Sequence, residues 1–197
     1  MSDFVDIDYQ PNYLRNKNEL EAFAIFSICV AGKNADTTKK ALIKFLNKWA
    51  QKTQKRTPFN IIKSFKNKKD LAQALKKEGI GCYTLRADYI LDLVNSKINL
   101  ENCNIEDLEK IKGIGPKTAR FFVLFSQKNS EQLAVLDVHI LRWLKNLGFD
   151  VPVNTPGSSK KYKEIEKIFI SQYKKYAKNL SLADFDYQLW QQMRMDK

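Results

Sequence analysis

The chain of 197 residues is long enough for one domain, or for one domain of two lobes, around a sizeable core. It has 34 Lys and Arg against 22 Asp and Glu, and this net charge of +12 favours a polyanion or an anionic membrane surface as partner. No basic-then-apolar leader and no apolar run of membrane-spanning length occurs, so we expect a soluble, intracellular protein and exclude a membrane-spanning class.

The three cysteines, Cys29, Cys82 and Cys103, lie far apart in the sequence. This spacing contains no disulfide framework, no paired zinc ligands and no run of the kind that holds an iron-sulfur cluster. The single histidine, His139, has no second histidine or paired cysteine nearby, so we interpret it as structural. The sequence therefore predicts neither a metal site nor an iron-sulfur cluster.

Helix-forming residues dominate, with only seven Gly and five Pro, and we predict an all-α fold. After an irregular arm at 1–17, a nearly all-round apolar segment at 18–30 indicates a helix that runs through the core. A polar loop then contains N-cap residues before the next helix. Further helices are predicted at 39–49, 58–66, 70–77 and 85–94, with a basic linker at 51–57 and a tight turn at Gly79 and Gly81.

A helix-hairpin-helix is predicted at 104–128. Asn104 is an N-cap for the first helix, Gly113 and Gly115 permit a tight turn, and Pro116 fits the first position of the second helix. The free amides at that helix start can hold a phosphate without reading a base, so we expect the hairpin to bind a nucleic-acid backbone. The residues expected to make this contact are Lys112, Gly113, Gly115 and Thr118. A glycine turn that only joins two helices is the alternative.

Lys117 lies just past the hairpin, and Asp137 begins another predicted helix twenty residues later. This separation accommodates one helix and a return loop, so both side chains are expected to face one cleft. A lysine amine can form a Schiff base with a sugar C1′, and a carboxylate can stabilise the positive charge that develops on the sugar. Asp137 also occupies an N-cap position, so a structural role is open as well.

The C-terminal part begins with a proline-containing loop at 149–159 and a long amphipathic helix at 160–178, whose lysines we interpret as a solvated face. The last predicted helix, 182–193, places Asp186 and Trp190 on one face. A carboxylate accepts from the N1–H and N2–H groups of guanine while an indole stacks on its ring, so this pair suits a guanine pocket. The alternative is that Trp190 only anchors the helix to the core.

These motifs carry a family resemblance. GIGPKTA followed by LAVLDVHILRWL resembles the helix-hairpin-helix DNA glycosylase superfamily. Within it, the chain looks most like the compact, archaeal-type 8-oxoguanine DNA glycosylase/AP lyases, through residues 19–39 and through GIGCYTLRADYIL, SSKKYKEIEKIF and FDYQLWQQMRMDK. The four-cysteine iron-sulfur loop of endonuclease III is missing, and this absence, with the D-x-x-x-W ending, favours an oxidised purine over an oxidised pyrimidine as substrate.

The resemblance implies a bifunctional enzyme of base excision repair that binds double-stranded DNA with a damaged base, flips out 8-oxoguanine and excises it. Lys117 would form the Schiff base and Asp137 would stabilise the sugar, with strand cleavage by β-elimination. Asp186, Trp190 and the terminal carboxylate of Lys197 would form the base pocket. Two other functions stay open: an endonuclease III-like glycosylase for oxidised pyrimidines, and a non-catalytic DNA-binding module, against which the retention of Lys117 and Asp137 argues.

The resemblance also implies DNA contacts outside the hairpin. Asn34, with Lys33 beside it, would fill the space left by the extruded base, and Tyr83 would be a wedge in the opened base stack. The alternatives are that Asn34 only caps a helix, and that Tyr83 packs inward while Arg86 is a solvated residue. The loop AGKNADTT differs from that typical of the archaeal-type enzymes, so the base preferred opposite the lesion stays open.

The resemblance further implies two helical lobes, one of residues 1–30 with 150–197 and one of residues 31–149, with the active site in the cleft between them. A monovalent cation on the backbone carbonyls of the hairpin is the one cofactor that it suggests. We expect the protein to act as a monomer, in the cytoplasm or at the nucleoid, without a membrane partner.

Overall fold

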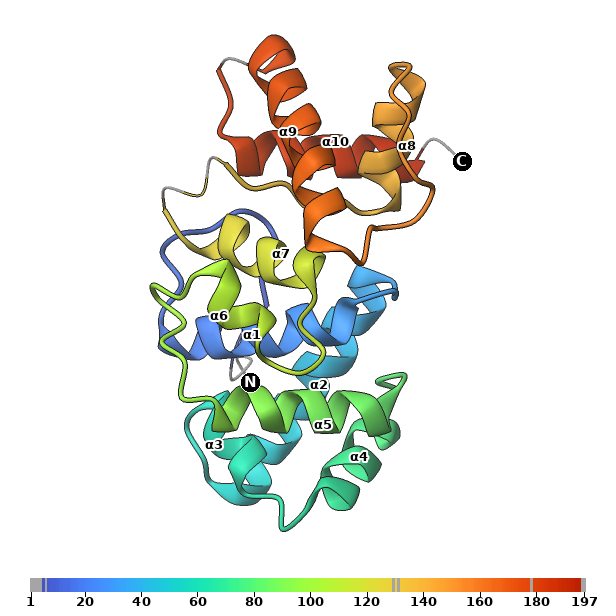
Figure 1. Ribbon diagram of the computed structural model, residues 1–197. Helices are drawn as coiled ribbons and strands as arrows, with labels where there is room; N and C mark the ends of the chain where they lie inside the picture. The colour runs from blue at the N-terminus through green and yellow to red at the C-terminus, as the bar shows by residue number, and fades with distance from the viewer. Residues whose placement is uncertain (1–4, 6, 129, 131, 178, 196–197) are drawn as a thin grey trace. The chain divides into compact units, whose positions relative to one another are not determined.

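The computed structural model describes residues 5, 7–128, 130, 132–177 and 179–195 (Figure 1). These residues form α-helices and no strand, so the predicted all-α fold is confirmed. None of the described helices combines the length and the apolarity needed to cross a membrane. The helices are α1 (Lys17–Val30), α2 (Ala35–Thr53), α3 (Pro58–Lys63), α4 (Lys68–Lys77), α5 (Tyr83–Asn95), α6 (Ile105–Glu109), α7 (Pro116–Ser126), α8 (Val138–Asn146), α9 (Ser159–Tyr176) and α10 (Leu182–Met195).

The predicted helices are present, and their boundaries shift where local caps decide them. α2 begins before the predicted position 39 because the side chain of Asn34 accepts a backbone hydrogen bond in its first turn. The same helix continues to Thr53, so part of the predicted linker 51–57 is helical. α5 begins at Tyr83, which therefore belongs to the helix and not to the turn before it.

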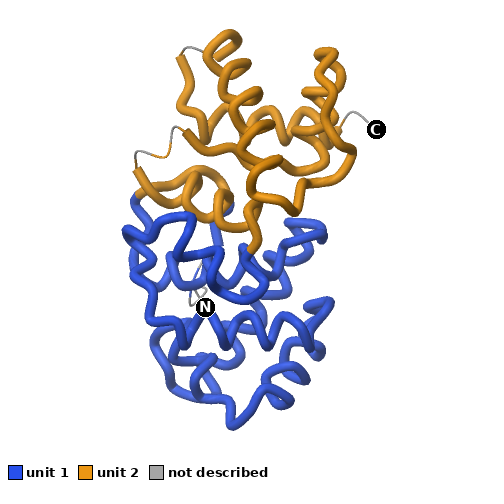
Figure 2. The backbone as a smooth tube through the Cα atoms, in the orientation of Figure 1, with its two compact units in different colours: residues 1–9, 14–114 blue, residues 10–13, 115–197 orange. Residues whose placement is uncertain are grey.

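The chain divides into two compact units, shown in different colours in Figure 2: residues 1–9 with 14–114, and residues 10–13 with 115–197. In the first unit, α1 is buried along most of its length and packs against α2, α3 and α5. Phe23, Ile25 and Phe26 are at most 1% exposed. A helix without a polar face is stable only inside a core, and the prediction of a core helix at 18–30 is confirmed.

The second unit has its own core, in which α10 packs against α8 and α9. Trp143 of α8 meets the rings of Phe169 and Phe185 edge-on, with both pairs of ring centroids 5.8 Å apart. Such edge-to-face contacts add to the stabilisation that burial of the rings provides. These contacts fix α8, α9 and α10 against each other.

The compact units have other boundaries than the predicted lobes of 1–30 with 150–197 and of 31–149. α1 lies in the first unit because its apolar surface is covered by α2, α3 and α5, whereas α9 and α10 pack with α8 in the second. The boundary between the units falls between Ile114 and Gly115, inside the predicted hairpin. The arrangement of two lobes around a cleft stays a prediction.

Candidate active site

Lys117 is the second residue of α7, whose start is set by Pro116. The N-cap, Gly115, has extended backbone and provides no side-chain cap to the helix. Lys117 is half-buried, whereas Thr118 is buried. A phosphate contact at Thr118 would therefore be made through its backbone amide.

Asp137 is the N-cap of α8, as its position in the sequence suggests. Its Oδ1 atom accepts hydrogen bonds from the amides of His139 at 2.8 Å and Ile140 at 2.9 Å. The predicted structural role is therefore real, and the carboxylate is held by two backbone donors at the helix start. The side chain is half-buried, so the cap leaves part of it accessible.

Asp186 lies in the same region of the second unit as Lys117 and Asp137. Its side chain is 3% exposed, and Oδ2 accepts a hydrogen bond from the amide of Val135 at 3.2 Å. Burial raises the pKa of this carboxyl well above its usual value, the charge of Asp137 raises it further, and the Val135 bond and the charge of Lys117 oppose the shift. The amine of Lys117 and the carboxyl of Asp137 thus both lie within electrostatic range of Asp186.

We expect Asp186→Asn to stabilise the protein at neutral pH relative to wild type. The raised pKa means that the folded state favours the protonated carboxyl. This carboxyl therefore contributes its full stabilisation below the unfolded-state pKa of 3.8, and the contribution is lost as pH rises through the folded-state pKa. Asparagine keeps an acceptor for Val135 and never ionises. The difference in unfolding free energy, measured by urea denaturation from pH 4 to 8, should grow with pH, and a constant difference would contradict the assignment.

Trp190 is one helical turn after Asp186 on α10, as predicted, and is half-buried. Its indole stacks on Tyr187 at 6.1 Å, meets the ring of His139 edge-on at 6.5 Å, and lies under the guanidinium of Arg194 at 4.7 Å. The contact with His139, two residues after Asp137, places the indole near the start of α8. They are compatible with both predicted roles, a pocket wall and an anchor.

His139 contacts residues of α10 in the described part of the chain. Its Nδ1 lies 3.3 Å from the carbonyl oxygen of Met193, so the ring links α8 to α10. No group of three or more metal-ligating side chains is found among the described residues. Lys197, the third residue predicted for the base pocket, lies outside them.

The first half of the hairpin belongs to the first unit and is fastened to α5. The amide of Lys112 donates to Oδ2 of Asp92 at 2.7 Å, and its ammonium lies 2.6 Å from Oδ2 of Asp88. The hydrogen bond to Asp88 raises the pKa of the lysine, so the charge predicted to meet DNA is already paired at its exposed end. Neither aspartate belongs to a motif in the sequence, although their spacing of four residues puts both on one face of α5.

Gly113 is required by both its backbone and its surroundings. Its φ of +81° lies in the left-handed region, and a Cβ atom there would overlap the ring of Tyr89. Tyr89 belongs to α5, and its ring covers the turn of the hairpin. The tight turn predicted at Gly113 is therefore held by a specific contact.

Gly113→Ala is expected to destabilise the protein by about 2–5 kcal/mol, because left-handed backbone adds about 1–2 and overpacking against Tyr89 about 1–3 kcal/mol. Gly79→Ala is the matched control in the same unit, since its φ is +84° with no atom within 4 Å of the added Cβ. It should lose only about 1–2 kcal/mol. Urea unfolding of both variants would test this, and equal losses would exclude the Tyr89 contact as a cause.

The loop after α1 places Asn34 and Lys33 beside the turn that precedes Tyr83. Oδ1 of Asn34 accepts from the amide of Thr37 at 3.0 Å, so its role as a helix cap is confirmed. The aliphatic end of Lys33 lies over Gly81, with its Cε 3.4 Å from where a Cβ of that glycine would be. Tyr83 is half-buried, with the ammonium of Lys76 5.3 Å from its ring centroid.

Arg86 is buried, so its interpretation as a solvated residue is wrong. Its guanidinium donates to the carbonyl of Gly81 at 2.6 Å and to that of Ala31 at 3.2 Å. Because it satisfies one carbonyl from each segment, it ties the turn before Tyr83 to the loop that leads to Asn34. The two loops predicted to contact DNA are thus connected within the first unit.

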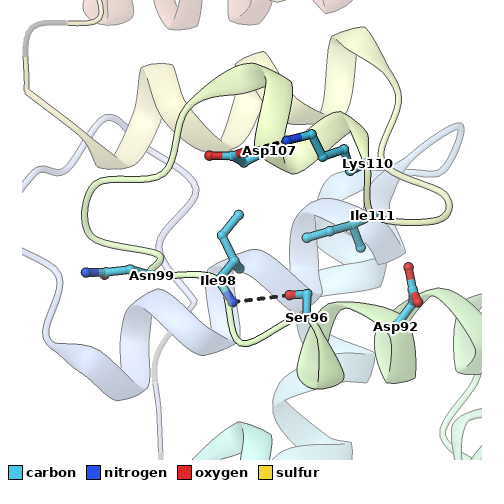
Figure 3. A pocket seen from close by; sticks show the side chains of 7 residues that line it. All are labelled: Asp92, Ser96, Ile98, Asn99, Asp107, Lys110 and Ile111. Carbon is cyan, nitrogen blue, oxygen red and sulfur yellow. Dashed lines mark hydrogen bonds and ion pairs between the residues drawn. The ribbon is translucent and has the colours of Figure 1, made fainter.

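A pocket of about 510 Å³ lies in the first unit at the end of α5 and along α6 (Figure 3). Asp107 and Lys110 form an ion pair of 2.8 Å at its wall, and Asp92 is the residue that holds the hairpin amide. Its lining includes none of the predicted site residues. The residues that line the pocket all belong to the first unit.

Comparisons with known proteins cover most of the chain. Residues 8–180 match the Ogg-HhH family, described as 8-oxoguanine DNA glycosylase. The 8-oxoguanine DNA glycosylase/AP lyase of Methanocaldococcus jannaschii is 30% identical over 132 residues, which span 62% of each chain. The match thus covers less than two thirds of that relative's length.

Solved structures share the fold over most of the chain. The M. jannaschii 8-oxoguanine DNA glycosylase has a TM-score of 0.66 at 27% identity, over 93% of this chain and 81% of that one. The M. jannaschii glycosylase/lyase in complex with a 15mer DNA containing 8-oxoguanine has a TM-score of 0.64 at 26% identity, over 93% and 84%. The 8-oxoguanine DNA glycosylase of Thermotoga maritima, 23% identical with a TM-score of 0.64 over 88% and 78%, supports the fold alone.

Proposed function

Because the chain belongs to the Ogg-HhH family of 8-oxoguanine DNA glycosylases, we propose that it excises 8-oxoguanine from double-stranded DNA and then cleaves the strand. The observation that carries this proposal is the grouping of Lys117, Asp137 and Asp186 in the second unit. An amine beside two carboxyls has the groups that a glycosylase with lyase activity needs. The chain would act in base excision repair as a monomer.

In the proposed reaction, the neutral amine of Lys117 attacks C1′ of the damaged nucleotide, and the bond between C1′ and the base breaks. The base leaves with the electron pair of that bond and takes up a proton. An ordinary lysine is protonated at neutral pH, so the amine must first lose a proton to a neighbouring group or to water. The C1′–O4′ bond then opens, O4′ takes a proton, and the carbon–nitrogen double bond of the Schiff base forms. The Schiff base makes a C2′ proton acidic, and removal of this proton expels the 3′ phosphate by β-elimination. Lyase activity thus follows from the choice of an amine as nucleophile.

Asp137 stabilises the positive charge that the sugar develops as the base departs. The α8 cap uses Oδ1 of this carboxylate, and we assign Oδ2 to the sugar. The two backbone donors fix the orientation of the carboxylate, so it needs no rearrangement when charge develops. One side chain thereby serves the helix and the reaction together.

The base would be held by Asp186, Trp190 and the carboxylate of Lys197. The DNA backbone would be held by the hairpin, at Lys112, Gly113, Gly115 and Thr118. Asn34, Lys33 and Tyr83 would occupy the opened duplex, and a monovalent cation would sit on the hairpin carbonyls. With a net charge of +12, DNA affinity should fall steeply as salt is raised. We place the enzyme in the cytoplasm or at the nucleoid.

Borohydride trapping on a panel of duplexes tests the function. The panel has 8-oxoguanine opposite cytosine, an oxidised pyrimidine opposite a purine, an abasic site, and undamaged DNA as control. A covalent adduct with the 8-oxoguanine duplex supports both the lyase chemistry and the substrate. An adduct with the oxidised pyrimidine alone would keep the chemistry and replace the substrate, and tight binding without any adduct would favour a non-catalytic module.

A further inference from the structure

The segment directly before Asp137 is held by buried side chains at every residue. Three consecutive amides each donate to a different side chain, and these side chains come from α9 and α10. The bonds run from Ala134 to Oε1 of Glu166 (2.9 Å), from Val135 to Oδ2 of Asp186 (3.2 Å), and from Leu136 to the hydroxyl of Tyr162 (2.9 Å). A segment outside any helix has thus obtained a partner for each of its three donors.

The carbonyls of this segment are held as well. The Tyr162 hydroxyl donates to the carbonyl of Ala134 at 2.9 Å, and the Thr155 hydroxyl donates to that of Leu136 at 2.7 Å. Tyr162 is fully buried and therefore uses its single hydroxyl as donor and acceptor on one segment. The path of the chain into Asp137 is fixed from both sides.

The same cluster reaches the helix of Lys117. Arg120, one turn along α7, donates to both carboxylate oxygens of Glu166, at 2.7 and 3.2 Å, and to the carbonyl of Pro116 at 3.2 Å. Its guanidinium also stacks on the ring of Tyr162, 4.5 Å from the centroid. Glu166 therefore binds the first turn of α7 through Arg120 and the segment before Asp137 directly.

The burial of this ion pair calls for a role beyond stability. Arg120 is 2% exposed and Glu166 is 6% exposed. Removing two charges from water offsets most of their attraction, and apolar residues of similar size often serve stability equally well. An apolar pair cannot fix the orientation of the two helices' side chains. An arginine–carboxylate pair can, because hydrogen bonds between the planar guanidinium and carboxylate groups require defined angles and distances.

We propose that Arg120, Tyr162 and Glu166 form a positioning cluster that sets the separation of Lys117 and Asp137 for the reaction. The inference rests on the proposed function, since it concerns the geometry of that active site. No member of the cluster is assigned a contact with DNA. Each acts through the backbone: Arg120 on the start of α7, and Tyr162 and Glu166 on the segment that leads to Asp137.

The cluster predicts a loss of rate without a matching loss of binding. A shift of about 1 Å between reacting groups can lower a rate about 10²-fold. Tyr162→Phe removes both hydroxyl bonds to the segment, and Glu166→Gln removes the charge that holds Arg120 while it keeps an acceptor for Ala134. Both variants should lower the single-turnover rate of 8-oxoguanine excision by about 10–100-fold at saturating enzyme, with DNA Kd within about twofold of wild type.

The matched control is Glu21→Gln in the first unit. Glu21 is a buried carboxylate that also accepts from a backbone amide, that of Phe59 at 2.9 Å, and it belongs to the other unit. Thermal melting of all variants separates loss of fold from loss of geometry. Glu21→Gln should melt earlier, as the cluster variants do, and keep the wild-type rate. Should Tyr162→Phe fail to fold, Thr155→Val removes one half-buried hydroxyl bond from the same segment and should still slow the reaction.

Variants of the cluster that excise at the wild-type rate would overturn the inference and leave the proposed function intact. The inference would also be overturned if the rate fell in proportion to the melting temperature, as strongly in Glu21→Gln as in the cluster variants. A wild-type protein that excises no damaged base would overturn the proposed function, and this inference with it. The wild-type assay therefore comes first.

Discussion

Lys117→Gln is expected to abolish the borohydride-trapped adduct on any lesion that the wild-type protein processes. Glutamine is polar and somewhat shorter than lysine, and its amide nitrogen cannot form a Schiff base. Loss of a nucleophile or of its proton-transfer partner lowers enzyme rates by about 10²–10⁶-fold, so strand cleavage should fall to background. Trapping on denaturing gels, with single-turnover cleavage of the same duplex, measures both effects.

The control is a lysine that the proposal assigns to DNA binding and not to the chemistry. Lys112→Gln meets this need for chemistry, because its ammonium pairs with Asp88 and it lies in the first unit, whereas Lys117 lies in the second. It should weaken DNA binding and leave trapping at saturating DNA unchanged. A trapped adduct that persists in Lys117→Gln would mean that another amine is the nucleophile.

Two substitutions of Asp137 are expected to separate catalysis from stability. Asp137→Asn keeps an oxygen that can accept from the amides of His139 and Ile140, and asparagine caps helices as well as aspartate does. Stability should be nearly unchanged, while excision slows by about 10²–10⁴-fold because the charge is lost. Asp137→Ala loses the cap too, and should cost about 0.5–2 kcal/mol of unfolding free energy in addition.

The measurements are single-turnover excision at saturating enzyme and urea unfolding of the same preparations. Asn104→Ala provides a control for the cap alone, because Asn104 caps α6 through the amide of Asp107 at 2.7 Å and is not assigned a catalytic role. It should lose stability and keep the rate. If Asp137→Asn excises at the wild-type rate, Asp137 is only a cap and the carboxylate acting on the sugar must be another.

Local sequence signals predicted the helices and the placement of the main site residues on them. The cap at Asn104, the glycine turn at Gly113, the helix start at Pro116 and the cap at Asp137 each act within three or four residues. Such interactions form in a short segment whatever the rest of the chain does. They placed Lys117 at a helix start and Asp137 at the next, before any packing was considered.

Partners from distant parts of the chain could not be predicted in the same way. Asp186 was expected to face a base, and in the free protein one of its oxygens binds the amide of Val135, 51 residues earlier. Arg86 was considered solvated, and it is buried, where it donates to the carbonyl of Ala31, 55 residues away. The sequence shows that such residues are polar, but it does not show whether they are buried or which distant group they bind.

The sequence by itself therefore determined the all-α class, the hairpin, and the positions of Lys117 and Asp137 at two helix starts. Only the tertiary structure decided that Asp186 lies beside them, that Lys112 is already paired with Asp88, and that Glu166 and Arg120 meet across 46 residues. The physical reason is the range of the forces. Caps and turns are satisfied by neighbours along the chain, whereas a buried charge needs a partner that packing alone brings to it.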